Sequence, residues 1–446
     1  MVHQRILALG FSAVVSMLAT AGFAQDKPLL PFSAASTHLG VSSCGGSSCH
    51  GALEPWDGST VLQNEFITWQ EKDPHAKAYK TLQSEESKRI ARNLGLPNAY
   101  EADMCLDCHA DNVPTERRAK GFEIADGVGC ESCHGGGERW LGIHVSGRAD
   151  HAENLNAGLF PTENAEARAR LCLSCHFGDK DRVITHRIMG AGHPRLAFEL
   201  DTYTMTQPAH FALDADYVRR KGEMDHVKVW AIGQAVATES LLDAMLDPAR
   251  NSDGIFPEFV FYDCHACHHP MSNVRWEPRE THGIGPGIPR LNDANLIMMA
   301  ALLDQVDASL AAQVRDRTRQ LHQASLKGHD ATLEAAKTLR GLIEPLIARL
   351  NAWSPSRQDL RAMLSAVIAR GLKGDYVDYS AAEQATMAMS AILDAMARAG
   401  AMSEQQHLDM VKVLDGAYAA ILKDEEYNPR QFLAVLQDIE AAVPRS

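Results

Sequence analysis

Residues 42–51 read SSCGGSSCHG, and this stretch together with four related ones decides what kind of fold the sequence encodes. It ends in Cys-His, as a haem-attachment motif does. However, four residues separate Cys44 from Cys49, whereas the usual motif Cys-X-X-Cys-His has two. Taken alone, the stretch fits a widened attachment loop, a disulfide or a coincidence.

The rest of the chain repeats the pattern. All ten cysteines fall into five close pairs, and the other four pairs read CLDCH (105–109), CESCH (130–134), CLSCH (172–176) and CHACH (264–268). Histidine makes up 20 of the 446 residues, yet it follows the second cysteine of every pair. Five such matches by chance are on the order of one in a few million, so the pattern indicates a chemical role.

Covalent haem explains every part of this pattern. Two thiols add to the two vinyl groups of one haem, and the next histidine supplies a nitrogen ligand to the iron. The small, pliable residues GGSS allow the wider first loop to span the same distance. We therefore predict five covalently attached c-type haems. Their attachment residues are Cys44, Cys49, Cys105, Cys108, Cys130, Cys133, Cys172, Cys175, Cys264 and Cys267, and their proximal iron ligands are His50, His109, His134, His176 and His268.

Disulfide bonds and zinc binding are two other uses of paired cysteines. Disulfides are common in exported proteins, and Cys105, Cys108, Cys130 and Cys133 have the two-pair spacing of a zinc ribbon. Neither alternative accounts for the histidine after each pair.

The N-terminus has the pattern of a secretory leader. A basic start (MVHQR) is followed by an apolar run (ILALGFSAVVSML) and small residues (ATAGFA). We expect a signal peptide at residues 1–24, with cleavage after Ala21 or Ala24, and a periplasmic protein with no membrane span after cleavage. An uncleaved anchor is the alternative.

The chain carries a formal net charge of -14. This charge argues against a nucleic-acid partner and favours redox partner proteins with a basic docking face. Ordinary solubility accounts for the acidity equally well, and the sequence leaves the oligomeric state open.

Composition divides the mature chain into unlike parts. A multihaem domain is predicted at 25–277, a linker at 278–292, and a haem-free antiparallel helical bundle at 293–446, which together give a mainly α fold with little regular sheet. The last part lacks cysteine and carries helix-start signals in SAAE (380–383), SEQQ (403–406) and Asn428–Pro429. We expect its apolar stripes to be buried chiefly within the bundle, as a separable domain.

Fifteen further histidines are available as second iron ligands. His75, near Trp69, and His193 are the first candidates, and His144, His186 and His269 are further ones. His186 and His193 stand seven residues apart, which suits two haems better than one. We assign His38, His210, His226 and His282 structural roles. Met189 and Met271 are alternative ligands, less favoured because histidine is in surplus.

Three segments carry a family resemblance: FITWQEKDPHAKAY (66–79), GVGCESCHGGG (127–137) and AGHPRLAFEL (191–200). Over residues 38–275 the chain resembles the cytochrome c554 family of exported multihaem cytochromes. The resemblance implies a mostly helical fold around closely stacked haems. It also implies two histidine ligands at most irons, sometimes with one open iron, and it assigns His75 and His193 as distal ligands. Here five motifs stand where the family has a core of four, and the C-terminal part lies outside the resemblance.

These observations favour a periplasmic pentahaem electron carrier. The alternative is a haem enzyme with one open iron, acting on a nitrogen oxide, hydroxylamine or a similar small substrate. No catalytic signature was found, and no lysine replaces a motif histidine. A third hypothesis, compatible with both, is that the C-terminal helices dock the haem domain onto a partner.

Overall fold

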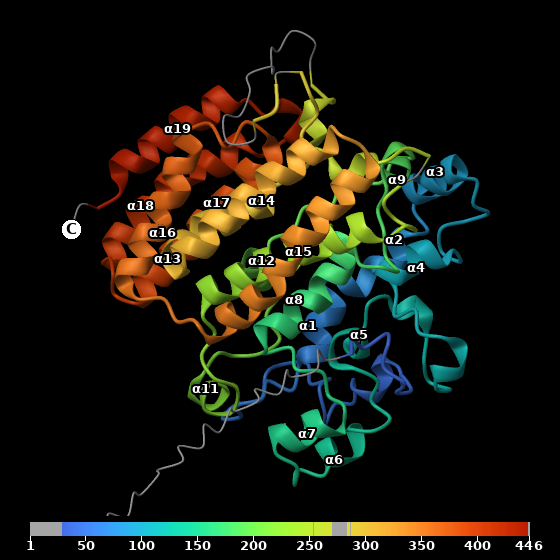
Figure 1. The fold of residues 1–446 in the computed structure, drawn as a ribbon. Coiled ribbons are helices and arrows are strands. Elements are labelled where there is room, and N and C mark those ends of the chain that lie inside the picture. Colours follow the sequence, from blue (N-terminus) through green and yellow to red (C-terminus); the bar gives the residue numbers. More distant parts are fainter. Residues whose placement is uncertain (1–28, 253, 270–282, 286, 445–446) are drawn as a thin grey trace, which may run out of the picture.

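The computed structural model describes residues 29–252, 254–269, 283–285 and 287–444 (Figure 1). Within these ranges it contains helices, no β-sheet, and two isolated bridges, His38–Arg118 and Tyr262–Leu291. The predicted mainly α fold is confirmed. None of the helices in these ranges has the length and hydrophobicity needed to traverse a lipid bilayer. The expected leader (1–24), part of the expected linker (278–282 and 286), Met271 and His282 lie outside the described residues.

The segment that carries the first four motifs consists of short helices and long loops. These helices are α1 (Glu65–Lys72), α2 (Ala78–Thr81), α3 (Glu85–Leu94), α4 (Asp103–His109), α5 (Cys130–His134), α6 (Leu141–Val145), α7 (His151–Ala157), α8 (Ala165–Leu173), α9 (His186–Gly190), α10 (Leu200–Thr206) and α11 (Ala215–Lys221). Helices this short are marginal in isolation. The apolar cluster particular to this segment is small: Leu82, Ala91, Ala99, Leu106 and Ala110. Side-chain packing is therefore too limited to fix the loops of this segment, and these loops need further contacts.

The remaining helices are longer and lie mostly alongside one another (Figure 1). They are α12 (His226–Leu246), α13 (Ala294–Val306), α14 (Ala308–Ser325), α15 (His329–Ala352), α16 (Arg357–Leu372), α17 (Tyr379–Arg398), α18 (Glu404–Ala420) and α19 (Pro429–Ala442). The predicted capping box at Ser403–Gln406 starts α18, and Asn428 caps α19 with Pro429 in its first turn. The expected box at Ser380 is absent, because Asp378 caps α17 two residues earlier and leaves Ser380 inside the helix.

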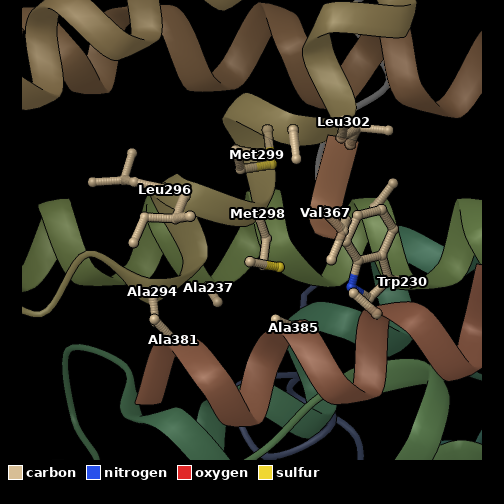
Figure 2. Packing of buried hydrophobic residues seen from close by; sticks show 14 of the residues in the cluster. Trp230, Ala237, Ala294, Leu296, Met298, Met299, Leu302, Val367, Ala381 and Ala385 are labelled. Atoms are coloured by element: carbon tan, nitrogen blue, oxygen red, sulfur yellow. The ribbon is translucent and has the colours of Figure 1, made fainter. Parts of the chain in front are cut away.

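The main hydrophobic core lies among the long helices. Figure 2 shows Trp230 of α12, Met298 of α13 and Val367 of α16 meeting side chains of α17. The side-chain amides of Gln234 and Gln384 are buried in this core, and Gln234 Nε2 donates a hydrogen bond to Gln384 Oε1 at 2.8 Å. The core thus joins α12, which precedes the fifth motif, to helices that follow it.

The contacts of α12 are relevant to the predicted boundary between the haem domain and the helical bundle. α12 packs against α15, α13 and α17 of the bundle and also against α8 and α10, which carry or adjoin haem motifs. The boundary at 278–292 stays a prediction. The packing shows that the bundle core includes a helix from the segment assigned to the haem domain.

Candidate haem-binding sites

The five motifs adopt different local structures. The second and third motifs are single helical turns, α4 and α5. The fourth spans the end of α8 and a π-helical turn at Ser174–Gly178, and the fifth includes a 3-10 turn at Cys264–Ala266. We number the sites 1 to 5 in chain order of their motifs.

The widened first motif closes into a compact loop. His50 N donates to Cys44 O at 3.1 Å, and Gly51 N donates to Gly46 O at 3.0 Å. A Cβ added at Gly51 would lie 2.0 Å from Gly45 O, so the loop requires glycine there. The two extra residues are accommodated within the turn, which keeps His50 next to Cys44.

The cysteines adopt neither of the alternative roles. All ten are free thiols, with no disulfide among them. Among the described residues, one group of potential metal ligands converges to within 4.8 Å, and it is His38, Asp111 and Glu131, without cysteine. In that group His38 Nδ1 lies 2.7 Å from Asp111 Oδ2, while both oxygens of Glu131 accept backbone N–H groups. This group contains no cysteine ligand and is therefore not a zinc ribbon.

Each motif histidine faces a second histidine from elsewhere in the chain. The ring centres are 5.9–6.4 Å apart in the five pairs, which are His50–His144, His109–His193, His134–His210, His176–His75 and His268–His186. Every motif histidine occurs once, and no second histidine is shared.

This spacing fits one iron between each pair of rings. A metal–imidazole bond is about 2 Å long, and a ligating nitrogen lies roughly 1 Å from its ring centre, so two axial rings should be about 6 Å apart. Direct stacking would bring two rings closer, to about 4.5 Å at the near end of the usual range. The residues present therefore fit five haem groups, each attached by one cysteine pair and held between two histidines.

Hydrogen bonds orient several of these rings. Ligating histidines usually bond through their other ring nitrogen to a carboxylate or a carbonyl, which fixes the tautomer and the ring plane. Four of the ten rings do so through Nδ1, which leaves Nε2 for a metal. The contacts are His50 to Glu65 (2.8 Å), His75 to Asp73 (2.8 Å), His109 to Ala78 O (3.2 Å) and His193 to Pro194 O (2.8 Å).

The electrostatic surroundings keep two of the motif histidines in the form that can bind a metal. Burial lowers the pKa of His134 to about 3 and that of His176 to about 4, so both imidazoles are neutral at pH 7. At site 1, the hydrogen bond with Glu65 raises the pKa of His50. A carboxylate partner of this kind also makes a ligating ring more basic.

The sites adjoin one another through their cysteines. The thiols of Cys44 and Cys130 share a hydrogen bond that lowers the pKa of Cys44 and raises that of Cys130, which places site 1 against site 3. Cys108 and Cys175 form a similar pair, in which the hydrogen bond raises the pKa of Cys108 and lowers that of Cys175 to about 7. Site 2 therefore lies against site 4.

Two further links complete the series. Burial first, and then the nearby thiols of Cys172 and Cys175, raise the pKa of Cys133, so site 3 adjoins site 4. His186 opens α9 and His193 follows it, which connects site 5 with site 2. Each site is thus linked to at least one other: site 1 to site 3, site 3 to site 4, site 4 to site 2, and site 2 to site 5.

The comparison with known families agrees with this geometry. Residues 43–135 match the family model described as cytochrome c554 and c-prime, a range that contains the first three motifs and His75. Over these residues the chain is similar to the cytochrome c554 family. The match confirms the resemblance over residues 43–135 and implies covalently bound c-type haem. No curated protein and no solved structure matches the chain.

The structure differs from the sequence analysis at one candidate ligand position. It places His210, to which we assigned a structural role, opposite His134, with ring centres 6.4 Å apart. His269, a predicted ligand, is half-buried beside His268, and the ring that faces His268 is His186. His210 was missed because QPAHFAL carries no haem signature.

The other histidines are placed as structural groups. His38 is fully buried against Asp111, and His226 Nδ1 lies 2.9 Å from Asp201 Oδ1. His322, His329 and His407 lie on helices of the bundle.

Contacts with the bundle hold two of the haem sites. Arg195, two residues after His193, forms ion pairs with Glu383 at 3.3 Å and Asp424 at 3.7 Å. Within the fifth motif, His265 Nε2 lies 2.8 Å from Asp424 O. Sites 2 and 5 are therefore tied to the same turn between α18 and α19.

Proposed function

We propose that this chain is a periplasmic pentahaem c-type cytochrome that transfers electrons between redox partner proteins. The observation that carries the proposal is the set of five histidine pairs, each joining one motif histidine to one other ring at 5.9–6.4 Å. Haem supplies one-electron chemistry when bound.

The paired rings favour a carrier over an enzyme. Two protein ligands on each metal leave no position for a substrate, and an unchanged ligand set requires little rearrangement on oxidation or reduction. An enzyme with one open iron would need at least one motif histidine without a second ring opposite, and all five motif histidines have one.

The arrangement of the sites supports the same function. Cysteines of neighbouring motifs touch or nearly touch, as at Cys44–Cys130 and Cys108–Cys175. Little protein therefore separates one site from the next, which is what passage of electrons through the molecule requires. The net charge of -14 suits partners with a basic docking face.

The proposal predicts five haems, all with two histidine ligands. Mass spectrometry of the mature protein should give the polypeptide plus five haems that resist acid-acetone extraction. Low-temperature EPR of the oxidised protein should show low-spin iron only. Four haems would contradict the assignment of the first motif, and a stoichiometric high-spin signal would instead support the enzyme alternative.

A further inference from the structure

Arg168 is a buried cation without an ionic partner. It lies on α8, one turn before Cys172, and only 9% of the residue is exposed. Its Nε is buried and makes no hydrogen bond, and its guanidinium forms no ion pair with any residue that the structure describes. Because a buried unpaired charge is strongly unfavourable, such a group calls for an anion.

A second cation lies close by. Lys221, the last residue of α11, has its Nζ 5.1 Å from the ring centre of Tyr217, which is itself buried. Burial lowers the pKa of Lys221, and this lysine also has no ion pair within the described ranges. Burial raises the pKa of the Tyr217 phenol, and the charge of Arg168 partly offsets the rise, so Arg168 lies in the same neighbourhood as Tyr217 and Lys221.

The carboxylates of this region are already occupied. Asp201 is close enough to be affected by Arg168, but it bonds to His226 at 2.9 Å. Glu163 is near Lys221, but it bonds to His151 at 2.7 Å. Asp201 and Glu163 therefore bond to histidines, and neither forms an ion pair with Arg168 or Lys221.

Lys221 and Tyr217 lie near site 3. Aromatic contacts lead from His210 to Phe211 at 5.8 Å and from Phe211 to Tyr217 at 5.6 Å. Lys221 is also among the charges that affect His134, whose pKa is lowered chiefly by burial. Lys221 and the Phe211–Tyr217 pair of rings therefore adjoin the pair of histidines at site 3.

We propose that Arg168 and Lys221 form a carboxylate-binding site that receives the two propionate groups of the haem at site 3. The proposal rests on the proposed presence of haem there. Two cations match two propionates in charge, and a guanidinium can bind a carboxylate through two parallel hydrogen bonds. The site would orient this haem and neutralise its acidic groups inside the protein.

The test is a redox titration of the full-length holoprotein carrying Arg168→Met. Reduction adds negative charge, so loss of a nearby positive charge should move one of the five midpoint potentials to a lower value. Lys221→Gln should lower the same midpoint, and Arg168→Lys should restore most of the change. If Arg168→Met and Lys221→Gln both leave all five midpoints unchanged, the proposal is wrong.

Arg170→Met is the matched control. Arg170 lies on the same helix, but ion pairs with Glu166 at 2.7 Å and Glu239 at 2.5 Å already neutralise it. Its loss should weaken thermal stability and leave every midpoint in place. An equal midpoint shift in this control would show that the effect of Arg168 is merely structural, and would overturn the proposal.

Two measurements separate this proposal from related ones. Mass spectrometry of the wild type counts its haems, so a missing haem would refute the proposed function independently of Arg168. Sodium nitrite added to the wild type tests a free oxyanion as the occupant. Unchanged midpoints are expected, whereas a nitrite-dependent shift that Arg168→Met abolishes would assign the site to a soluble anion instead.

Discussion

At the scale of single residues, the pairing of His210 with His134 gives a direct test of site 3. Replacing His210 by Ala should remove one axial ligand and convert one of five irons from low spin to high spin. EPR of the oxidised variant should show one high-spin signal per molecule. His407→Ala is the control, because His407 bonds to Asp394 on the bundle at 2.8 Å. An unchanged spectrum for His210→Ala would mean that another residue is the ligand.

The attachment cysteines and the histidine ligands differ in how well the sequence alone predicts them. The cysteines and the histidines that follow them are found by a rule of adjacency, since attachment chemistry fixes their spacing. His75 and His193 stand in recognisable segments. His210 stands in an unremarkable loop, and only the folded chain brings it to His134. A distal ligand is set by tertiary structure, which local sequence does not encode.

At the scale of elements, substitutions in the loop of the first motif test whether this widened motif attaches a haem. Gly51→Ala should prevent the turn, because the new Cβ would meet the backbone oxygen of Gly45 at 2.0 Å, and backbone atoms cannot move aside easily. We expect the variant to carry four haems, as counted by mass spectrometry.

Gly46→Ala is the matched control in the same loop. A Cβ there would meet only Cys49, with Sγ at 3.6 Å, which is ordinary van der Waals contact. This variant should keep all five haems. Five haems in both variants would show that the loop tolerates a different turn.

At the scale of the whole molecule, the shared core tests the predicted boundary between domains. A fragment of residues 25–290 would retain α12 but lose the helices that cover Trp230, Ile232 and Leu242, each of which is fully buried. Exposing each such side chain costs about 1.5–3 kcal/mol, and the sum approaches the whole stability of a typical domain. We therefore expect the fragment to aggregate when it is expressed in a strain that matures c-type cytochromes.

The chain 25–444 is the control for this fragment and should be recovered with five haems. If the fragment alone is soluble, carries five haems and has normal spectra, the tail is the separable domain that composition predicts. Composition identified the bundle because long amphipathic helices leave a clear pattern. It could not assign α12, since a helix that is apolar on all sides marks burial without showing which partner buries it.

The contacts between cysteines of different motifs have a consequence for how the protein is made. A chain that folded before receiving its haems would bring the Cys44 thiol against Cys130 and Cys108 against Cys175. Oxidation of both pairs would then crosslink four motifs in two pairs and remove four attachment points. Biogenesis therefore has to proceed in a fixed order, with thiols kept reduced and haems attached while the polypeptide is still open, and with compaction as the last step.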